Sequence, residues 1–114
     1  MNSHFEGSQI PVTTVQQLKE NLDQHIDLCL LDVREDWEFE GGHLPNALHI
    51  RLGSLSTRIQ DLPQNKPIVI YCHHGSRSQR ACELLKPLGF GMVSNLEGGI
   101  DAWSCHIDPQ IKRY

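Results

Sequence analysis

The chain has 114 residues, of which 39% are hydrophobic and 21% are charged, a composition typical of one folded domain. Its formal net charge of −4 argues against nucleic acid as the main partner, and no apolar run is long enough to span a membrane. The four cysteines form no C-x-x-C pair, which favours a reduced, cytoplasmic protein over a disulfide framework.

The first part of the chain predicts a tail, an edge strand and a helix. Residues 1–9 are polar and lack a periodic pattern, as expected of a flexible N-terminal tail. Residues 10–12 fit a short edge strand, because the proline there cannot donate to a strand ladder. Thr14 and Gln17 have the spacing of a capping box, so a helix should begin after Thr14 and end near residue 24.

Apolar runs then alternate with helical patterns. Residues 28–33 predict a buried strand and residues 47–50 a shorter one, and the apolar spacing over residues 52–62 predicts a helix. Residues 92–96 predict the last strand, and residues 100–105 a short helix after a glycine turn. This alternation indicates a parallel sheet with helices on both faces.

The stretch around Cys72 is the most informative part of the sequence. Residues 68–71 form an apolar run that predicts a strand covered on both faces. A helix with one buried side is predicted by the apolar residues at i, i+3, i+4 and i+7: Ala81, Leu84, Leu85 and Leu88. Cys72 would then lie at the carboxyl end of a buried strand, where parallel sheets place their ligand crevices. A helix N-terminus and a cation such as Arg77 both stabilise a thiolate, so the stretch predicts a nucleophilic cysteine in an anion-binding loop.

Charged residues are also expected at this edge of the sheet. Asp32, Arg34 and Glu35 follow the strand predicted at residues 28–33, either as a solvated loop or as a charge network that braces the crevice. His43 is expected to be a structural hydrogen-bonding partner rather than a general base.

The remaining histidines and tryptophans of interest have simpler expected roles. His73 and His74 are expected to be exposed loop residues that tune the charge at the mouth of the crevice. Adjacent residues rarely converge on one metal, so the run Cys72-His73-His74 does not predict a zinc site. Trp37 and Trp103 are expected to be packing residues, with a position near the pocket as the alternative for Trp37.

Four separate stretches resemble the rhodanese family of single-domain sulfurtransferases. Residues 32–35 (Asp-Val-Arg-Glu) and 42–47 (Gly-His-Leu-Pro-Asn-Ala) resemble the family's D-V-R-E and G-H-I-P-G-A motifs, with Asn46 where glycine is frequent. Asparagine tolerates the left-handed backbone almost as well as glycine, so Asn46 is expected to adopt it. Residues 71–78 resemble its Y-C-x-x-G-x-R-S loop, and residues 96–103 resemble its L-x-G-G-x-x-x-W ending. The stretches follow the family's order and spacing over most of the chain.

The resemblance implies a rhodanese-like α/β fold of about five parallel strands with helices on both faces. The expected domain covers residues 10–107, and a C-terminal tail follows at residues 108–114. In such a protein, Cys72 would take a sulfane sulfur from a small anionic donor such as thiosulfate and pass it to cyanide or a thiol, without cofactor or metal. The loop residues implied to bind donor and persulfide are His73, His74, Gly75, Ser76, Arg77 and Ser78. The residues expected to support that loop are Asp32, Arg34, Glu35 and His43.

Three other functions stay open from the sequence. Cys72 could be a sulfur carrier loaded by a protein persulfide, or the domain could be a non-catalytic binding module, although both Cys72 and Arg77 are present. Phosphatases and arsenate reductases of related fold have a C-x5-R loop, with five residues between the cysteine and the arginine. This chain has four residues between Cys72 and Arg77. The shorter loop should be too tight for a phosphoryl group, which favours sulfur transfer.

Overall fold

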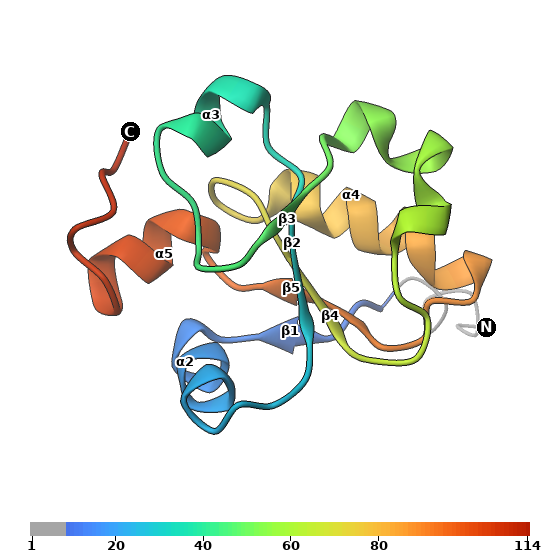
Figure 1. The fold of residues 1–114 in the computed structure, drawn as a ribbon, viewed down its shortest axis with the longest axis horizontal. Helices are drawn as coiled ribbons and strands as arrows, with labels where there is room; N and C mark the ends of the chain where they lie inside the picture. Colours follow the sequence, from blue (N-terminus) through green and yellow to red (C-terminus); the bar gives the residue numbers. More distant parts are fainter. Residues whose placement is uncertain (1–8) are drawn as a thin grey trace.

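The computed structural model describes residues 9–114, and its centre is a five-stranded, wholly parallel sheet (Figure 1). The strands are β1 (Val12–Thr13), β2 (Cys29–Asp32), β3 (Leu48–His49), β4 (Ile68–Tyr71) and β5 (Val93–Leu96). Their order across the sheet is β1-β5-β4-β2-β3, with every neighbouring pair parallel. The predicted fold class is therefore confirmed. The predicted tail at residues 1–9 lies outside the described residues, apart from Gln9.

Helices cover both faces of this sheet. The α-helices are α2 (Val15–Asp23), α3 (Asp36–Glu40), α4 (Ser76–Leu85) and α5 (Gly99–His106). Three 3-10 helices are η1 (Leu52–Thr57), η2 (Ile59–Asp61) and η3 (Lys86–Leu88). Figure 1 shows α2 and α5 together on one side of the sheet, whereas α4 packs with η1 on the other.

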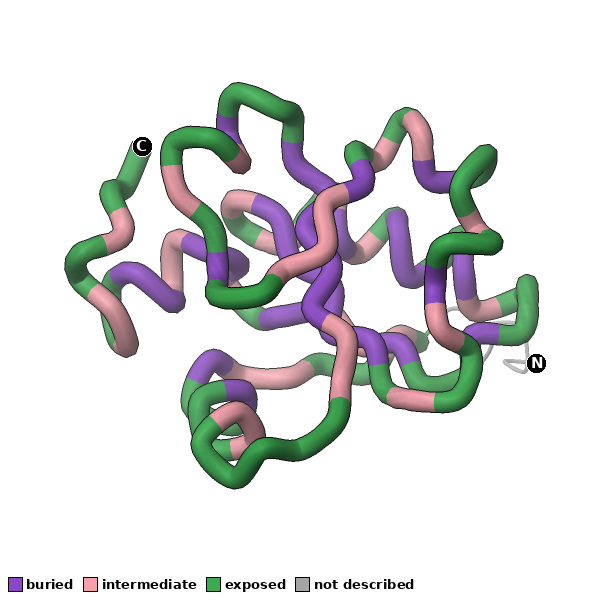
Figure 2. The backbone as a smooth tube through the Cα atoms, in the orientation of Figure 1, coloured by how far each residue is buried: buried purple, intermediate pink, exposed green. Residues whose placement is uncertain are grey.

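The central strand β4 contributes to both hydrophobic cores. Successive side chains of a strand point to opposite faces. Ile68, Ile70 and Cys72 therefore join the core beneath α4, whereas Val69 and Tyr71 join the core beneath α2 and α5. All four residues of β4 are buried, and Figure 2 shows buried segments gathered at the centre of the molecule, where the strands lie. The predicted two-sided burial is confirmed, and Cys72 enters its loop with its side chain on the α4 side.

Two local predictions hold in detail. Thr14 caps α2, and a capping box forms because the Gln17 N–H donates to the Thr14 hydroxyl at 3.1 Å and the Thr14 N–H donates to the Gln17 side chain at 2.9 Å. Asn46 takes the left-handed backbone that a glycine would supply, with φ of 61°. Short-range sequence patterns thus predict the short-range structure.

The helix predicted over residues 52–62 is wrong in type. The segment forms η1 and η2, which are separated at Arg58. Leu55 and Leu62 are buried, and each follows another apolar residue at a spacing of three. A repeat of three is the period of a 3-10 helix, so the same apolar pattern fits the observed structure.

Two predictions about burial are also wrong: the residues that form the buried face of α4, and the packing of Trp37. Leu84 and Leu88 are 36% and 49% exposed, because the buried face of α4 comprises Ser78, Ala81, Cys82 and Leu85. The α-helix ends at Leu85 and the chain continues as η3, so Leu88 does not extend that face. Trp103 packs as predicted at 3% exposure, but Trp37 is 66% exposed on the short helix α3.

Candidate functional site

Cys72 follows directly after β4 and is 1% exposed. The backbone N–H groups of Gly75 and Ser78 donate to its Sγ at 3.1 and 3.4 Å, and the Ser78 Oγ lies 3.4 Å from the same sulfur. The loop thus wraps three polar groups around one sulfur atom at the start of α4. This arrangement stabilises negative charge on that sulfur, because each N–H dipole points at it.

Two further donors at the start of α4 have no acceptor. The first N–H groups of a helix lack partners within the helix. Among the described residues, the N–H groups of Ser76 and Arg77 donate to no backbone or side-chain acceptor outside the helix. They are available to an anion that enters the loop, at the positive end of the helix dipole.

Asn95 holds the loop in shape from the neighbouring strand β5. Its amide Nδ2–H donates to the Gly75 carbonyl at 3.0 Å, and its Oδ1 accepts a hydrogen bond from the Ser78 hydroxyl at 2.5 Å. Gly75 has a φ of 122°, a conformation that residues with a Cβ rarely adopt, so the curl of the loop at this position favours glycine. Gly75 was predicted as a residue of this loop, whereas no pattern in the sequence pointed to Asn95 as part of the site.

The N-terminus of α5 fixes the first part of the loop. The N–H groups of Ile100 and Asp101 donate to the carbonyls of Cys72 and His73 at 2.9 and 3.1 Å. The backbone of α5 lies so close to the loop that a Cβ on Gly99 would be 2.5 Å from the carbonyl oxygens of both Cys72 and His73. Gly99 is therefore required sterically, and the loop has little room to move on that side.

Arg77 forms a two-point ion pair with Glu38, which comes from α3. The Arg77 NH1 and NH2 groups donate to the two carboxylate oxygens at 2.7 and 2.9 Å. Glu38 is 5% exposed, and the hydrogen bonds from Arg77 hold the pKa of its carboxyl down at about 2. The charge of Arg77 is thus already balanced by a protein carboxylate. Glu38 was missed in the sequence because nothing local connects it to a residue 39 positions away.

Asp32 and Arg34 form a second ion pair, and both side chains are fully buried. The Arg34 NH2 group donates to Asp32 at 2.8 Å and to the Gly42 carbonyl at 2.7 Å. Glu35 does not join this network: it is exposed and lies 3.7 Å from the exposed Arg51. The structure thus brings two of the three predicted charges together beneath the site.

Tyr114 connects the two ion pairs. Its hydroxyl donates to Glu38 at 2.6 Å and accepts a hydrogen bond from Arg34 at 2.9 Å. Its ring stacks on His73, with ring centres 3.9 Å apart and planes 8° apart. Figure 1 shows the C-terminal segment returning towards α3, the helix that carries Glu38. The last part of the chain therefore belongs to the surroundings of the loop.

The two loop histidines differ. His74 is exposed, as predicted, with 66% of its side chain accessible. His73 is not freely exposed: it lies between His74 and the ring of Tyr114, and its Nε2 is buried without a partner among the described residues. Burial, together with the neighbouring His74, lowers the pKa of His73. The lowered pKa makes His73 less able to offer a positive charge to an anion that enters the loop.

His43 and Ser76 lie at the margins of the site. His43 is exposed, its ring stacks on Phe39 with centres 3.8 Å apart, and its Nδ1 lies 3.1 Å from the Phe39 carbonyl oxygen. Ser76 is the exposed first residue of α4, and Gly75 occupies the cap position, so neither loop serine caps the helix. Of the two serines, Ser78 is the one that contacts Cys72.

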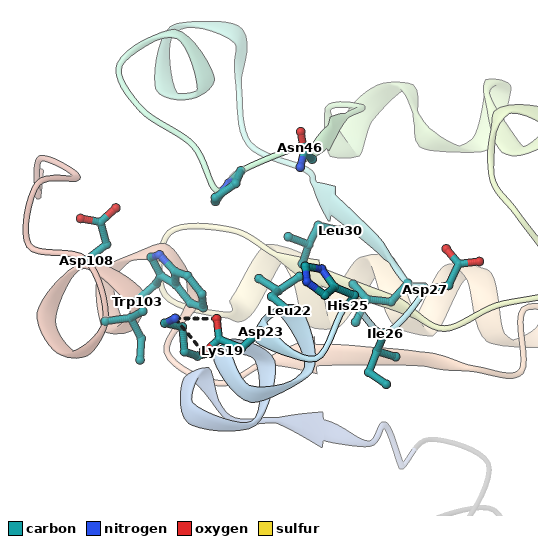
Figure 3. Close-up of a pocket in the computed structure, with 13 residues that line it drawn as sticks. Lys19, Leu22, Asp23, His25, Ile26, Asp27, Leu30, Asn46, Trp103 and Asp108 are labelled. Atoms are coloured by element: carbon teal, nitrogen blue, oxygen red, sulfur yellow. Dashed lines mark hydrogen bonds and ion pairs between the residues drawn. The ribbon is translucent and has the colours of Figure 1, made fainter.

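A separate groove of about 760 Å³ lies between α2, the start of β2 and α5 (Figure 3). Figure 3 shows Leu22, His25 and Trp103 around it, and no residue of the Cys72 loop lines it. Within residues 9–114, no group of three or more histidine, cysteine or acidic side chains is placed to hold a metal ion. In the same part of the chain, no helix has the length and apolarity needed to cross a membrane.

Comparison with known proteins identifies the family. The family described as a rhodanese-like domain matches residues 14–106, and the chain belongs to that family. A sulfurtransferase of Allochromatium vinosum is 37% identical over 91 residues, which cover 80% of this chain and 85% of that protein. The crystal structure of a rhodanese-like domain protein from Staphylococcus aureus is similar with a TM-score of 0.81 and 28% identity, covering 92% of this chain and 99% of that one.

A third relative is longer than this chain. YrkF of Bacillus subtilis, whose name describes it as a candidate sulfur carrier protein, is 37% identical over 103 residues. The match covers 90% of this chain but 56% of YrkF, so the chain spans little more than half of that relative. Relatives named as a sulfurtransferase and as a sulfur carrier both support a role in sulfur transfer.

Proposed function

We propose that this protein is a sulfurtransferase that carries the transferred sulfur as a persulfide on Cys72. The observation that supports it best is the convergence of the Gly75 and Ser78 N–H groups on the Cys72 Sγ. A thiolate at this position is the nucleophile, and the same donors stabilise it again as the leaving group when the sulfur moves on. Because Cys72 is 1% exposed, the persulfide is also shielded from water.

Thiosulfate is the proposed donor for the first half of the reaction. The Cys72 thiolate attacks the outer sulfur of thiosulfate, the sulfur–sulfur bond breaks, and sulfite leaves with the bonding electron pair. The unpaired N–H groups of Ser76 and Arg77 would hold the donor's anionic end. In the second half, cyanide or a thiol attacks the outer sulfur of the persulfide and the Cys72 thiolate is restored.

A sulfur carrier loaded by a protein persulfide is the second candidate function. The ion pairs favour it, because Glu38 already balances Arg77 and Asp32 already balances Arg34. A small dianion such as thiosulfate therefore meets no unpaired arginine in this site. The thiosulfate route and the carrier route share the Cys72 persulfide and differ in what loads it. We expect either activity to operate in the reducing cytoplasm, where Cys72 stays a free thiol.

The intact mass of the protein tests this function. Reduced protein incubated with thiosulfate should gain one sulfur atom, and cyanide should remove it as thiocyanate. Cys72→Ser should abolish the gain because the nucleophile is lost. Cys105→Ser is the matched control, since Cys105 is exposed and outside the loop, and it should still gain the sulfur.

The possible results separate the two candidates. No gain from thiosulfate, together with a gain from a protein persulfide, would favour the carrier. A gain that persists in Cys72→Ser would overturn the proposed mechanism, because the sulfur would then reside on another cysteine.

A further inference from the structure

A narrow slot adjoins the Cys72 loop. It has a volume of about 190 Å³ and is lined by Trp37, Glu38, Gly41, Gly42, Lys112 and Tyr114. Two of these residues join it to the loop: Glu38 is the partner of Arg77, and Tyr114 stacks on His73. The slot therefore adjoins the loop, and it shares no lining residue with the groove of Figure 3.

Two exposed aromatic rings form the walls of the slot. Trp37 is 66% exposed and Tyr114 is 48% exposed, and their rings meet edge to face with centres 5.8 Å apart. Tyr114 is held in place because Arg113 pairs with Asp101 at 2.9 Å and Ser104 donates to the Ile111 carbonyl. Fixed, exposed tryptophan and tyrosine side chains are the residues that most often carry binding energy.

Lys112 gives the slot an unbalanced positive charge. The nearby arginines are each neutralised: Arg34 by Asp32, Arg77 by Glu38 and Arg113 by Asp101. Lys112 forms no ion pair with any residue in the described part of the chain. A ligand that fills the slot can therefore pair a carboxylate with Lys112 while its carbon skeleton contacts the rings.

We propose that the slot binds the body of the acceptor, a thiol-bearing amino acid or short peptide with a free carboxylate. This inference rests on the proposed sulfur transfer and specifies the substrate of its second half. Trp37 and Lys112 are the residues that set specificity. The acceptor thiolate attacks the outer sulfur of the Cys72 persulfide, the bond between the two persulfide sulfurs breaks, and the Cys72 thiolate leaves with the electron pair. The proton on the outer sulfur stays there, so the product is the acceptor's persulfide and no external oxidant is needed.

Cyanide is the matched control acceptor, because it has no amino-acid or peptide skeleton that could occupy the slot. Protein loaded with thiosulfate or inorganic polysulfide is discharged by cyanide or by glutathione, a tripeptide thiol with free carboxylates. Trp37→Ala should lower the ratio of the glutathione rate to the cyanide rate about tenfold. Trp37→Phe should restore most of that ratio, because it keeps an aromatic wall. Lys112→Glu should lower the ratio as well, by replacing attraction of the carboxylate with repulsion.

A binding measurement gives a readout that does not require turnover. S-methylglutathione has a blocked thiol but keeps the rest of the tripeptide, and its binding should change the tryptophan fluorescence. Trp37→Phe leaves Trp103 as the second and remaining tryptophan and should abolish this change, which assigns the signal to Trp37. Lys112→Glu should weaken this saturable change. Met92→Ala is the control, since Met92 is 49% exposed and precedes β5, at the opposite end of the strand from the loop, and it should alter neither rate nor binding.

The results distinguish failure of the slot from failure of sulfur transfer. If Cys72 gains no sulfur from either donor, the proposed function is overturned and the slot's role with it. If Cys72 is loaded but Trp37→Ala leaves the ratio of the two rates unchanged, the slot proposal alone is overturned. If S-methylglutathione binds Lys112→Glu as tightly as the unchanged protein, the carboxylate assignment is wrong.

Discussion

Two carboxylate–guanidinium pairs lie on either side of Tyr114, and they differ in what surrounds them. Asp32 and Arg34 are both fully buried, two residues apart in the sequence. Arg77 keeps 32% of its side chain accessible, whereas its partner Glu38, 39 residues away, keeps 4%. The chemistry of the two pairs is the same, but their access to solvent is not.

This difference separates a structural role from a role near the substrate. A buried arginine is fixed because breaking its pair leaves an uncompensated charge in a medium of low dielectric constant. A partly exposed arginine can exchange its carboxylate for water or for another anion at a lower cost. We therefore expect Arg34 to support the loop and Arg77 to respond to what enters it.

Arg34→Ala should have the largest effect on stability. It strands the buried Asp32 carboxylate and removes the donor to Gly42, which should cost about 3–5 kcal/mol of unfolding free energy. Urea unfolding of the variant and the unchanged protein measures this difference. The double variant Asp32→Leu with Arg34→Met removes both charges and should be more stable than Arg34→Ala. A double variant that is equally unstable would show that packing, rather than the stranded charge, dominates.

Arg77→Ala should have a smaller effect on stability and a clear effect on activity. Glu38 keeps hydrogen bonds from Tyr114 and the Glu35 N–H, so the loss should be about 1–2 kcal/mol. The rate at which thiosulfate transfers sulfur to Cys72 should fall more than the rate at which cyanide removes it, because thiosulfate is a larger anion than cyanide. Arg77→Lys keeps the charge but loses the two-point geometry, so it should fall between Arg77→Ala and the unchanged protein. Unchanged loading kinetics in Arg77→Ala would make Arg77 purely structural.

The ion pair of Glu38 should also make stability depend on pH in the acid range. The folded pKa of Glu38 is about 2, below its ordinary value of 4.5, so its stabilising contribution is complete above pH 4.5. That contribution is lost as the pH falls from 4.5 through 2. The difference in unfolding free energy between the unchanged protein and Glu38→Gln should therefore shrink over this range. A difference that stays constant with pH would mean that Glu38 is not titrating in this window.

Tyr114→Phe should have the smallest effect of the four. It removes the hydroxyl that links Arg34 to Glu38 but keeps the ring on His73, which should cost about 0.5–1.5 kcal/mol. Tyr114→Leu removes the ring as well and should cost more. Equal losses in the two variants, again by urea unfolding, would assign the contribution of Tyr114 to its hydroxyl alone.

The candidate site was predictable only where its residues are close in the sequence. Cys72, Gly75 and Ser78 lie in one loop, and the structure brings all three together around the sulfur. Glu38, Asn95 and Tyr114 reach the same place from other elements, and no local pattern marks them. Asn95 stands in a short predicted strand, but its hydrogen bond to the Gly75 carbonyl spans 20 residues and depends on β5 lying beside β4.

The sequence by itself determined the features that depend on neighbours along the chain. The capping box at Thr14 and the left-handed turn at Asn46 arise from short-range hydrogen bonds or steric limits, which a few residues set, and the unbroken apolar run of β4 leaves that strand no polar face to turn towards solvent. Only the tertiary structure decided that Glu38 takes Arg77 and that Trp37 remains exposed. Burial and ion pairing depend on which surfaces meet when the helices pack on the sheet, and apolar spacing along one element does not specify that.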